Sequence, residues 1–149
     1  MINHRGAGHP LVPAARLGAA SSLAALGLLH AAWALGSSWP APSQQALADA
    51  VVGAQAAPAR LPTAVVAVGL LTSAAVVSGA VGGTRLGRGA AAALSAAFVA
   101  RAALGGQGAA RMITSAAPSP RFQALDRRLY RPLCAAIGAA LLVSTAGEG

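Results

Sequence analysis

The sequence predicts an all-α integral membrane protein, built as a bundle of four transmembrane helices. Of its 149 residues, 56% are apolar and only 9% are charged, whereas a soluble domain carries roughly 25% charged residues. So few polar side chains do not cover a water-facing surface, and we therefore expect much of the surface to face lipid. Four apolar runs, at residues 17–36, 63–81, 89–105 and 129–146, approach the length needed to cross a hydrocarbon core of about 30 Å.

We expect a single helical domain at residues 17–146, between an N-terminal tail at 1–16 and a C-terminal tail at 147–149. The run 17–36 follows Arg16, and it has no formal charge at neutral pH. It is longer than the roughly 7–15 residues of a signal-peptide core and further apolar runs follow it, so we interpret it as a span rather than a cleaved signal. The next segment, 37–62, contains four prolines and is predicted to be a loop around a short helix at 44–55.

The third run contains a charge well inside its apolar sequence. The second run, 63–81, is rich in Val and Leu and is followed by Arg85 and Arg88. The run 89–105 is mostly Ala and includes Arg101, which costs roughly 2.5–3.5 kcal/mol at the centre of a helix. Neighbouring helices or an interfacial position offset this cost, so we expect four spans and keep three as the alternative.

The fourth span is predicted at 129–146, after a loop at 106–128 that contains two prolines and four arginines. An alternating strand pattern is absent, which argues against a β-barrel. Small residues recur at helical spacing and favour close helix contacts. These pairs are Gly18 with Ser22, Gly27 with Ala31, Gly79 with Gly83, and Ala135 with Ala139.

The charge pattern favours a membrane location over nucleic-acid binding. The net charge is +8, but all eleven cations are Arg and most flank apolar runs instead of forming a basic stripe. The Arg bias is typical of a GC-rich bacterial genome, and we expect several passes through a bacterial inner membrane. The N-terminus is assigned to the cytoplasm, because Arg16, Arg85 and Arg88 lie close to span ends.

Polar residues are predicted to meet at one membrane face. Alternating helices place the end of the first span, the end of the third and the start of the fourth on the same side. The residues in these three segments form a candidate polar pocket: His30, Trp33, Arg101, Asp126, Tyr130 and Cys134. If Asp126 belongs to the fourth helix, it pairs with Arg101 and offsets the cost of an unpaired charge near lipid.

Each of these residues also has a purely structural interpretation. His30 is either a packed, hydrogen-bonded residue, a proton or ligand group, or less plausibly a metal ligand. Trp33, Trp39 and Tyr130 suit the aromatic belt at the headgroup boundary. Cys134 is the sole cysteine, so it forms no disulfide within the chain and is expected to pack as a small residue. No metal-spaced cluster, P-loop or nucleophile motif is found, and we predict no cofactor and no metal.

Two segments carry a family resemblance. They are LLHAAWALGSSWP at Leu28 to Pro40 and LDRRLYRPLCAAIG at Leu125 to Gly138. On these motifs the chain resembles the bacterial domain-of-unknown-function 3995 family of small membrane proteins. The resemblance implies a four-helix membrane protein and supplies no activity. Arg131 departs from the small polar residue that the family pattern has before Pro132.

For function, we expect a non-enzymatic membrane component that binds lipid, a partner membrane protein or a second copy of itself. The small-residue faces and the lack of catalytic motifs support this expectation. The alternative is a membrane-embedded enzyme of isomerase or cyclase type, acting on a lipophilic substrate. In that case His30 or Asp126 exchanges protons, and Trp33 and Tyr130 line the pocket.

Overall fold

The computed structural model describes residues 11–54, 59–80, 84–108 and 117–146, and within them it contains helices and no strands. This confirms the all-α prediction. Residues 1–10 of the predicted N-terminal tail and the whole predicted C-terminal tail, 147–149, lie outside the described residues. The helices are α1 (Leu11–Ala34), α2 (Gln44–Val51), α3 (Arg60–Ala75) with the π-helical turn η1 (Val76–Ala80), α4 (Arg85–Leu104), α6 (Pro120–Leu125), the π-helical turn η2 (Asp126–Tyr130) and α7 (Arg131–Ala146).

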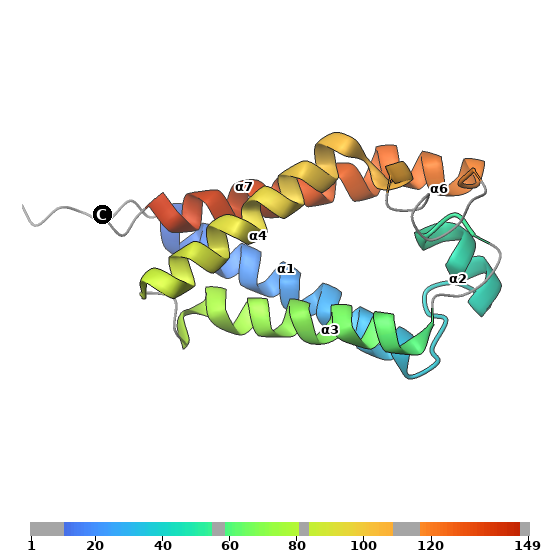
Figure 1. Cartoon of the computed structure of the whole chain (residues 1–149), viewed down its shortest axis with the longest axis horizontal. Helices are drawn as coiled ribbons and strands as arrows, with labels where there is room; N and C mark the ends of the chain where they lie inside the picture. Colours follow the sequence, from blue (N-terminus) through green and yellow to red (C-terminus); the bar gives the residue numbers. More distant parts are fainter. Residues whose placement is uncertain (1–10, 55–58, 81–83, 109–116, 147–149) are drawn as a thin grey trace, which may run out of the picture.

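The long helices form two pairs that meet at one end and diverge at the other. α1 packs along α3, α4 packs along α7, and α1 also contacts α7. The two pairs converge where α1 begins and α7 ends, as Figure 1 shows, and they separate toward the end where α2 and α6 lie. The ends of α1 and α4 and the start of the α6–η2–α7 segment therefore share one end of the bundle, as the alternating topology predicted.

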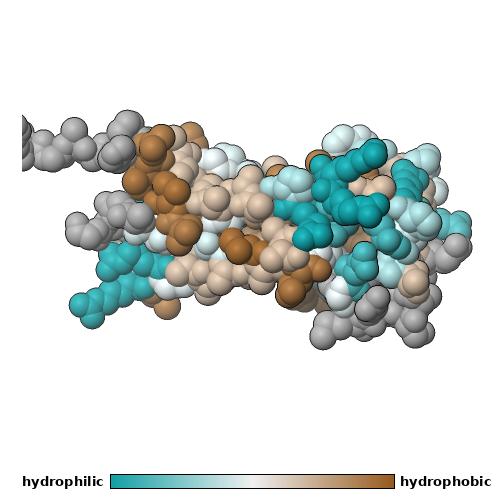
Figure 2. Space-filling model, turned by 90° about the horizontal axis from the view of Figure 1, so that it is seen from above, coloured by the Kyte–Doolittle hydropathy of each residue, from teal (hydrophilic) through white to brown (hydrophobic). Residues whose placement is uncertain are grey.

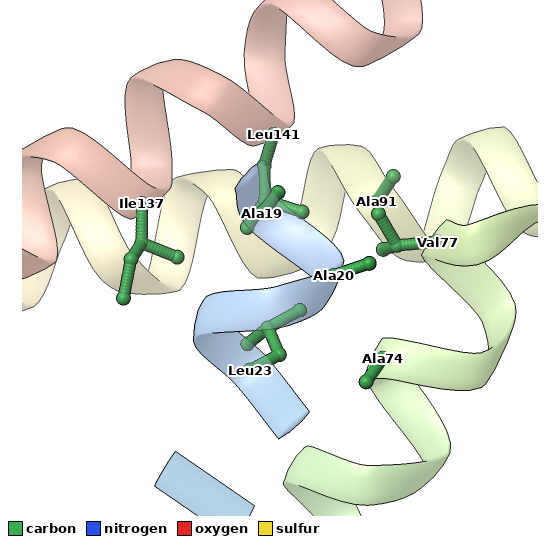
Figure 3. Close-up of a cluster of buried hydrophobic side chains, with 8 residues drawn as sticks. All are labelled: Ala19, Ala20, Leu23, Ala74, Val77, Ala91, Ile137 and Leu141. Carbon is green, nitrogen blue, oxygen red and sulfur yellow. The ribbon is translucent and has the colours of Figure 1, made fainter. Parts of the chain in front are cut away.

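The hydrophobic core lies toward the end of the bundle where α1 begins and α7 ends (Figure 1), and Figure 3 shows its buried side chains. Its buried members come from all four long helices: Ala19, Ala20, Leu23, Ala74, Val77, Ala91, Ile137 and Leu141. Several are alanines, whose short side chains let the backbones approach each other. Polar contact also joins α4 to α7, because the Ser95 hydroxyl donates a 2.8 Å hydrogen bond to the Gly138 carbonyl.

The predicted small-residue pairs are only partly used for helix packing. Gly27 packs against α3, since a Cβ there would lie 2.8 Å from the Leu71 Cγ. Gly18 has no neighbour within 4 Å of such an atom, and Ala135 and Ala139 are exposed. The expectation that Gly18, Ala135 and Ala139 pack against neighbouring helices is wrong, because spacing alone does not tell which face of a helix meets another. Gly83 lies outside the described residues.

Each long helical segment begins before the apolar run that predicted it. α1 begins at Leu11, so Arg16 is helical and not part of a tail. α4 begins at Arg85 and is capped by Thr84, whose hydroxyl accepts a hydrogen bond from the Gly87 N–H. Arg85 and Arg88 are therefore helical. The loop predicted at 106–128 is also wrong at its end, because a helix starts at Pro120. An apolar run reflects composition alone, whereas a helix continues until a cap or a turn ends it.

Two of the helices, Leu11–Ala34 and Arg60–Gly79, are long and apolar enough to cross a membrane. Only 22% of each apolar window is buried, unlike the core helix of a soluble protein. Large aliphatic side chains point outward along them, including Leu17 at 70% exposure, Leu28 at 63% and Val68 at 64%. Seen from above in Figure 2, the middle of the molecule is apolar and hydrophilic side chains gather toward its two ends.

Candidate functional site

A cavity of about 610 Å³ lies between the diverging ends of the two helix pairs. Its volume falls within the roughly 300–1,000 Å³ of small-molecule sites. The walls are mostly aliphatic and aromatic. The lining residues are Leu26, Leu29, His30, Trp33, Pro40, Ala41, Leu47, Ala50, Val51, Leu70, Phe98, Arg101, Arg121, Leu125, Leu129, Tyr130, Leu133 and Cys134.

The short helix α2 covers the open end of this cavity. It starts at Ser43, whose hydroxyl accepts a hydrogen bond from the Ala46 N–H, as helix caps commonly do. The Tyr130 hydroxyl donates a 3.0 Å hydrogen bond to the Ala50 carbonyl, which ties α2 to η2. In a second hydrogen bond, the Ser119 N–H before α6 donates to the Gly53 carbonyl after α2 at 3.2 Å. Tyr130 therefore binds α2 as well as lining the cavity.

His30 and Trp33 form the wall contributed by α1. Their ring centroids lie 4.8 Å apart, consistent with their spacing of three on one helical face. The Nδ1 of His30 donates a 2.8 Å hydrogen bond to the Leu26 carbonyl, so Nε2 is the acceptor nitrogen of the neutral ring. The Trp33 indole N–H donates to the Trp39 carbonyl at 2.7 Å. The Trp39 side chain itself is 70% exposed.

An ion pair lies at the α4 side of the cavity. Arg101 donates from Nη2 to the Asp126 Oδ1 at 2.6 Å, as predicted if Asp126 is helical. The other carboxylate oxygen, Oδ2, accepts a 3.0 Å hydrogen bond from the Gly106 N–H. Asp126 is 3% exposed and stands behind Arg101 instead of lining the cavity. The Nη1 of Arg101 is buried and has no hydrogen-bond partner among the described residues.

Two glycines allow the chain to pass around this ion pair. Gly105 ends α4 with a φ of 73°, a backbone conformation that favours glycine. A Cβ on Gly106 would lie 2.5 Å from the Phe122 Cζ and 2.6 Å from the Arg101 Nη2. This role of Gly106 was not predicted from the sequence. A Gly-Gly pair directly after a helix was the available signal.

Arg131 also has a role that sequence reasoning missed. Its Nε donates to the Ala102 carbonyl and its Nη2 to the Ala103 carbonyl, both at 2.7 Å. These carbonyls lie in the last turn of α4, where the helix provides no N–H partners. The guanidinium therefore caps α4 from the neighbouring helix.

A known protein family matches most of the chain. The family model described as "Protein of unknown function (DUF3995)" matches residues 23–141, which include every residue that lines the cavity and most of both helix pairs. The chain belongs to the DUF3995 family. No curated protein and no solved structure matches it.

Within this DUF3995 chain, the structure brings the six predicted pocket residues to one end of the bundle. His30, Trp33, Arg101, Tyr130 and Cys134 line the cavity, and Asp126 holds Arg101 from behind. Sequence reasoning missed Arg121 and the α2 residues Leu47, Ala50 and Val51, because no periodic signal linked them to the spans. In the described part of the chain, no three His, Cys, Asp or Glu residues gather as metal ligands.

Proposed function

We propose that the chain is a four-helix integral membrane protein that binds a lipid or another lipophilic ligand in the cavity, without catalysis. The observation that carries this proposal is a 610 Å³ cavity with mostly apolar walls in a molecule whose outer surface is also apolar. A ligand that partitions into the bilayer reaches such a cavity without crossing water.

The four-span arrangement is part of the proposal. α1 and α3 meet the length and hydropathy requirements for spans. α4 packs on α7, and α7 packs on α1, so α4 and the continuous α6–η2–α7 segment belong to the same bundle as α1 and α3 (Figure 1). Exposed aliphatic side chains continue onto these two segments at Val99, Leu142 and Val143. The ion pair with Asp126 offsets the cost of placing Arg101 near lipid.

Access to the cavity supports a ligand from the bilayer. Leu129 and Leu133 line it, and they keep 52% and 37% of their surface exposed. The wall formed by η2 and α7 is therefore accessible and apolar. The polar groups are concentrated at the end of the bundle, where the headgroup of a bilayer lipid would lie. We expect this location to be the inner membrane of a bacterium.

A direct test compares two neighbouring substitutions on α7. Cys134 lines the cavity, whereas Ala135 is exposed on the outside of the same helix. Each is changed to Phe in a chain that also carries Trp39→Phe, which leaves Trp33 as the single tryptophan. Binding of phospholipids with brominated acyl chains is measured in detergent by quenching of Trp33 fluorescence. We expect Cys134→Phe to weaken binding about tenfold or more by filling the cavity, and Ala135→Phe to leave it unchanged.

Circular dichroism spectra establish that both variants are folded. Contact of Trp33 with lipid outside the cavity is the same in both variants. Equal quenching in Cys134→Phe and Ala135→Phe would therefore contradict binding in the cavity.

A second candidate function is a membrane-embedded enzyme of isomerase or cyclase type. The observation that favours it is the fixed orientation of His30, whose Nδ1 is held by the Leu26 carbonyl, so that Nε2 is the nitrogen able to take a proton. Chromatography coupled to mass spectrometry, applied to lipid recovered after incubation, separates the two functions, because an isomeric product has the mass of its substrate but a different retention time. A binder returns the lipid unaltered, whereas an enzyme returns a product that is lost with His30→Gln.

A further inference from the structure

The charges around the cavity do not cancel. Its lining contains two arginines, Arg101 and Arg121, and no acidic residue. Asp126 neutralises Arg101 from behind, and both of its carboxylate oxygens already accept hydrogen bonds. One positive charge, on Arg121, therefore remains without an acidic partner in the described ranges. Arg101 and Arg121 line the same cavity as the Tyr130 phenol.

Two guanidinium side chains are accessible at this wall. Arg121 is exposed and the Arg101 side chain is 30% exposed, although the Arg101 Nη1 is itself buried. The Tyr130 hydroxyl already donates to the Ala50 carbonyl. The donors available to a ligand at this wall therefore come from guanidinium groups, which bind carboxylates and phosphates especially well.

Local structure holds Arg121 at the cavity. The residue lies in the first turn of α6, which starts at Ser119 with its hydroxyl accepting from the Phe122 N–H. Phe122 is 2% exposed and anchors this turn in the interior. The position of the Arg121 backbone is thus set by a cap and a buried aromatic ring, although its side chain is exposed.

Resting on the proposed function, we infer that the ligand is an anionic amphiphile. Its phosphate or carboxylate binds Arg101 and Arg121, and the start of its acyl or isoprenoid chain lies against Leu26, Leu29 and Leu70. The volume of 610 Å³ corresponds to about twenty water molecules at roughly 30 Å³ each. The cavity therefore accommodates a headgroup with a short part of the chain, and the rest extends into the bilayer.

The test uses phosphatidylglycerol and phosphatidylcholine with identical brominated acyl chains. Each is added to the full chain carrying Trp39→Phe, in a non-ionic detergent, and quenching of Trp33 gives the dissociation constant. We expect the anionic lipid to bind about tenfold more tightly than the zwitterionic one, and this preference to weaken at high salt. Arg121→Gln should remove most of the preference. Arg127→Gln, an exposed arginine outside the lining, should retain it.

The outcomes separate this inference from the proposed function. Equal binding of the two lipids, or equal effects of Arg121→Gln and Arg127→Gln, overturns the inference and leaves lipid binding standing. Absence of quenching by either lipid overturns both. Competition with glycerol phosphate distinguishes the source of the anion. If glycerol phosphate displaces the brominated lipid at a concentration similar to that of the lipid, the site binds a soluble phosphate compound. If it does not displace the lipid, the anion is the lipid headgroup.

Discussion

Asp126 shows, at the scale of single residues, how one side chain organises an end of the bundle. It is 3% exposed and accepts hydrogen bonds from Arg101 and from the Gly106 N–H. Through these contacts it fixes the end of α4 against the helix that contains Asp126. The pairing with Arg101 was predictable, because an isolated charge in an apolar run requires a partner and few acidic residues are available. The contribution of Gly106 was not, because it depends on the close approach of Phe122.

Asp126→Asn is predicted to destabilise the protein by about 3 kcal/mol, because it leaves the Arg101 charge without its counterion. Equilibrium unfolding in mixed detergent, followed by circular dichroism, measures the free energy of unfolding. The double variant Arg101→Met with Asp126→Leu should be more stable than Asp126→Asn, since it removes both charges. A double variant that is no more stable than the single one would contradict this account.

The ends of helices, at the scale of secondary structure, determine how the cavity is built. Ser119 and Pro120 start the fourth long helix before its apolar run, which places Arg121 and Asp126 on a helix. The Ser-Pro pair is a typical start of a helix, but the segment that follows it has too few apolar residues to continue the predicted span, so a loop was predicted there. Arg131 closes α4 from outside, and no pattern within α4 indicates this contact.

Arg131→Gln is predicted to lower the free energy of unfolding by about 1–2 kcal/mol, because two charge-assisted hydrogen bonds to the α4 carbonyls are lost. Amide hydrogen exchange should become faster in the last turn of α4, near Ala102 and Ala103. The matched control is Arg128→Gln, a neighbouring exposed arginine, which should change neither quantity. Equal effects of the two substitutions would indicate loss of surface charge instead of loss of a cap.

The bundle, at the scale of the whole molecule, combines a packed end with an open one. Small buried residues hold the helices together at the converging end, while α2 covers the cavity at the diverging end (Figure 1). Hydrophilic side chains gather toward the ends of the molecule and its middle is apolar (Figure 2), which is the placement that the proposed membrane location requires.

Four spans predict a specific labelling pattern. Single cysteines are placed at Pro42, Gln107 and Gly149 in a chain carrying Cys134→Ser, and membrane-impermeant maleimide is applied to intact spheroplasts. Positions 42 and 107 should lie on one side of the membrane and position 149 on the other, because α4 crosses once its Arg101 is paired. If α4 does not cross, positions 42 and 149 share a side and position 107 is opposite.

The sequence alone determined the fold class, the presence of four apolar segments and the end of the bundle at which the polar residues meet. These features follow from local composition, from helical periodicity and from the alternation of antiparallel helices. The tertiary structure decided which small residues pack, that Arg131 caps α4, and that Arg121 and α2 complete the cavity. These features depend on contacts between segments distant in sequence, where the distance between two atoms, and not the order of residues, sets the energy.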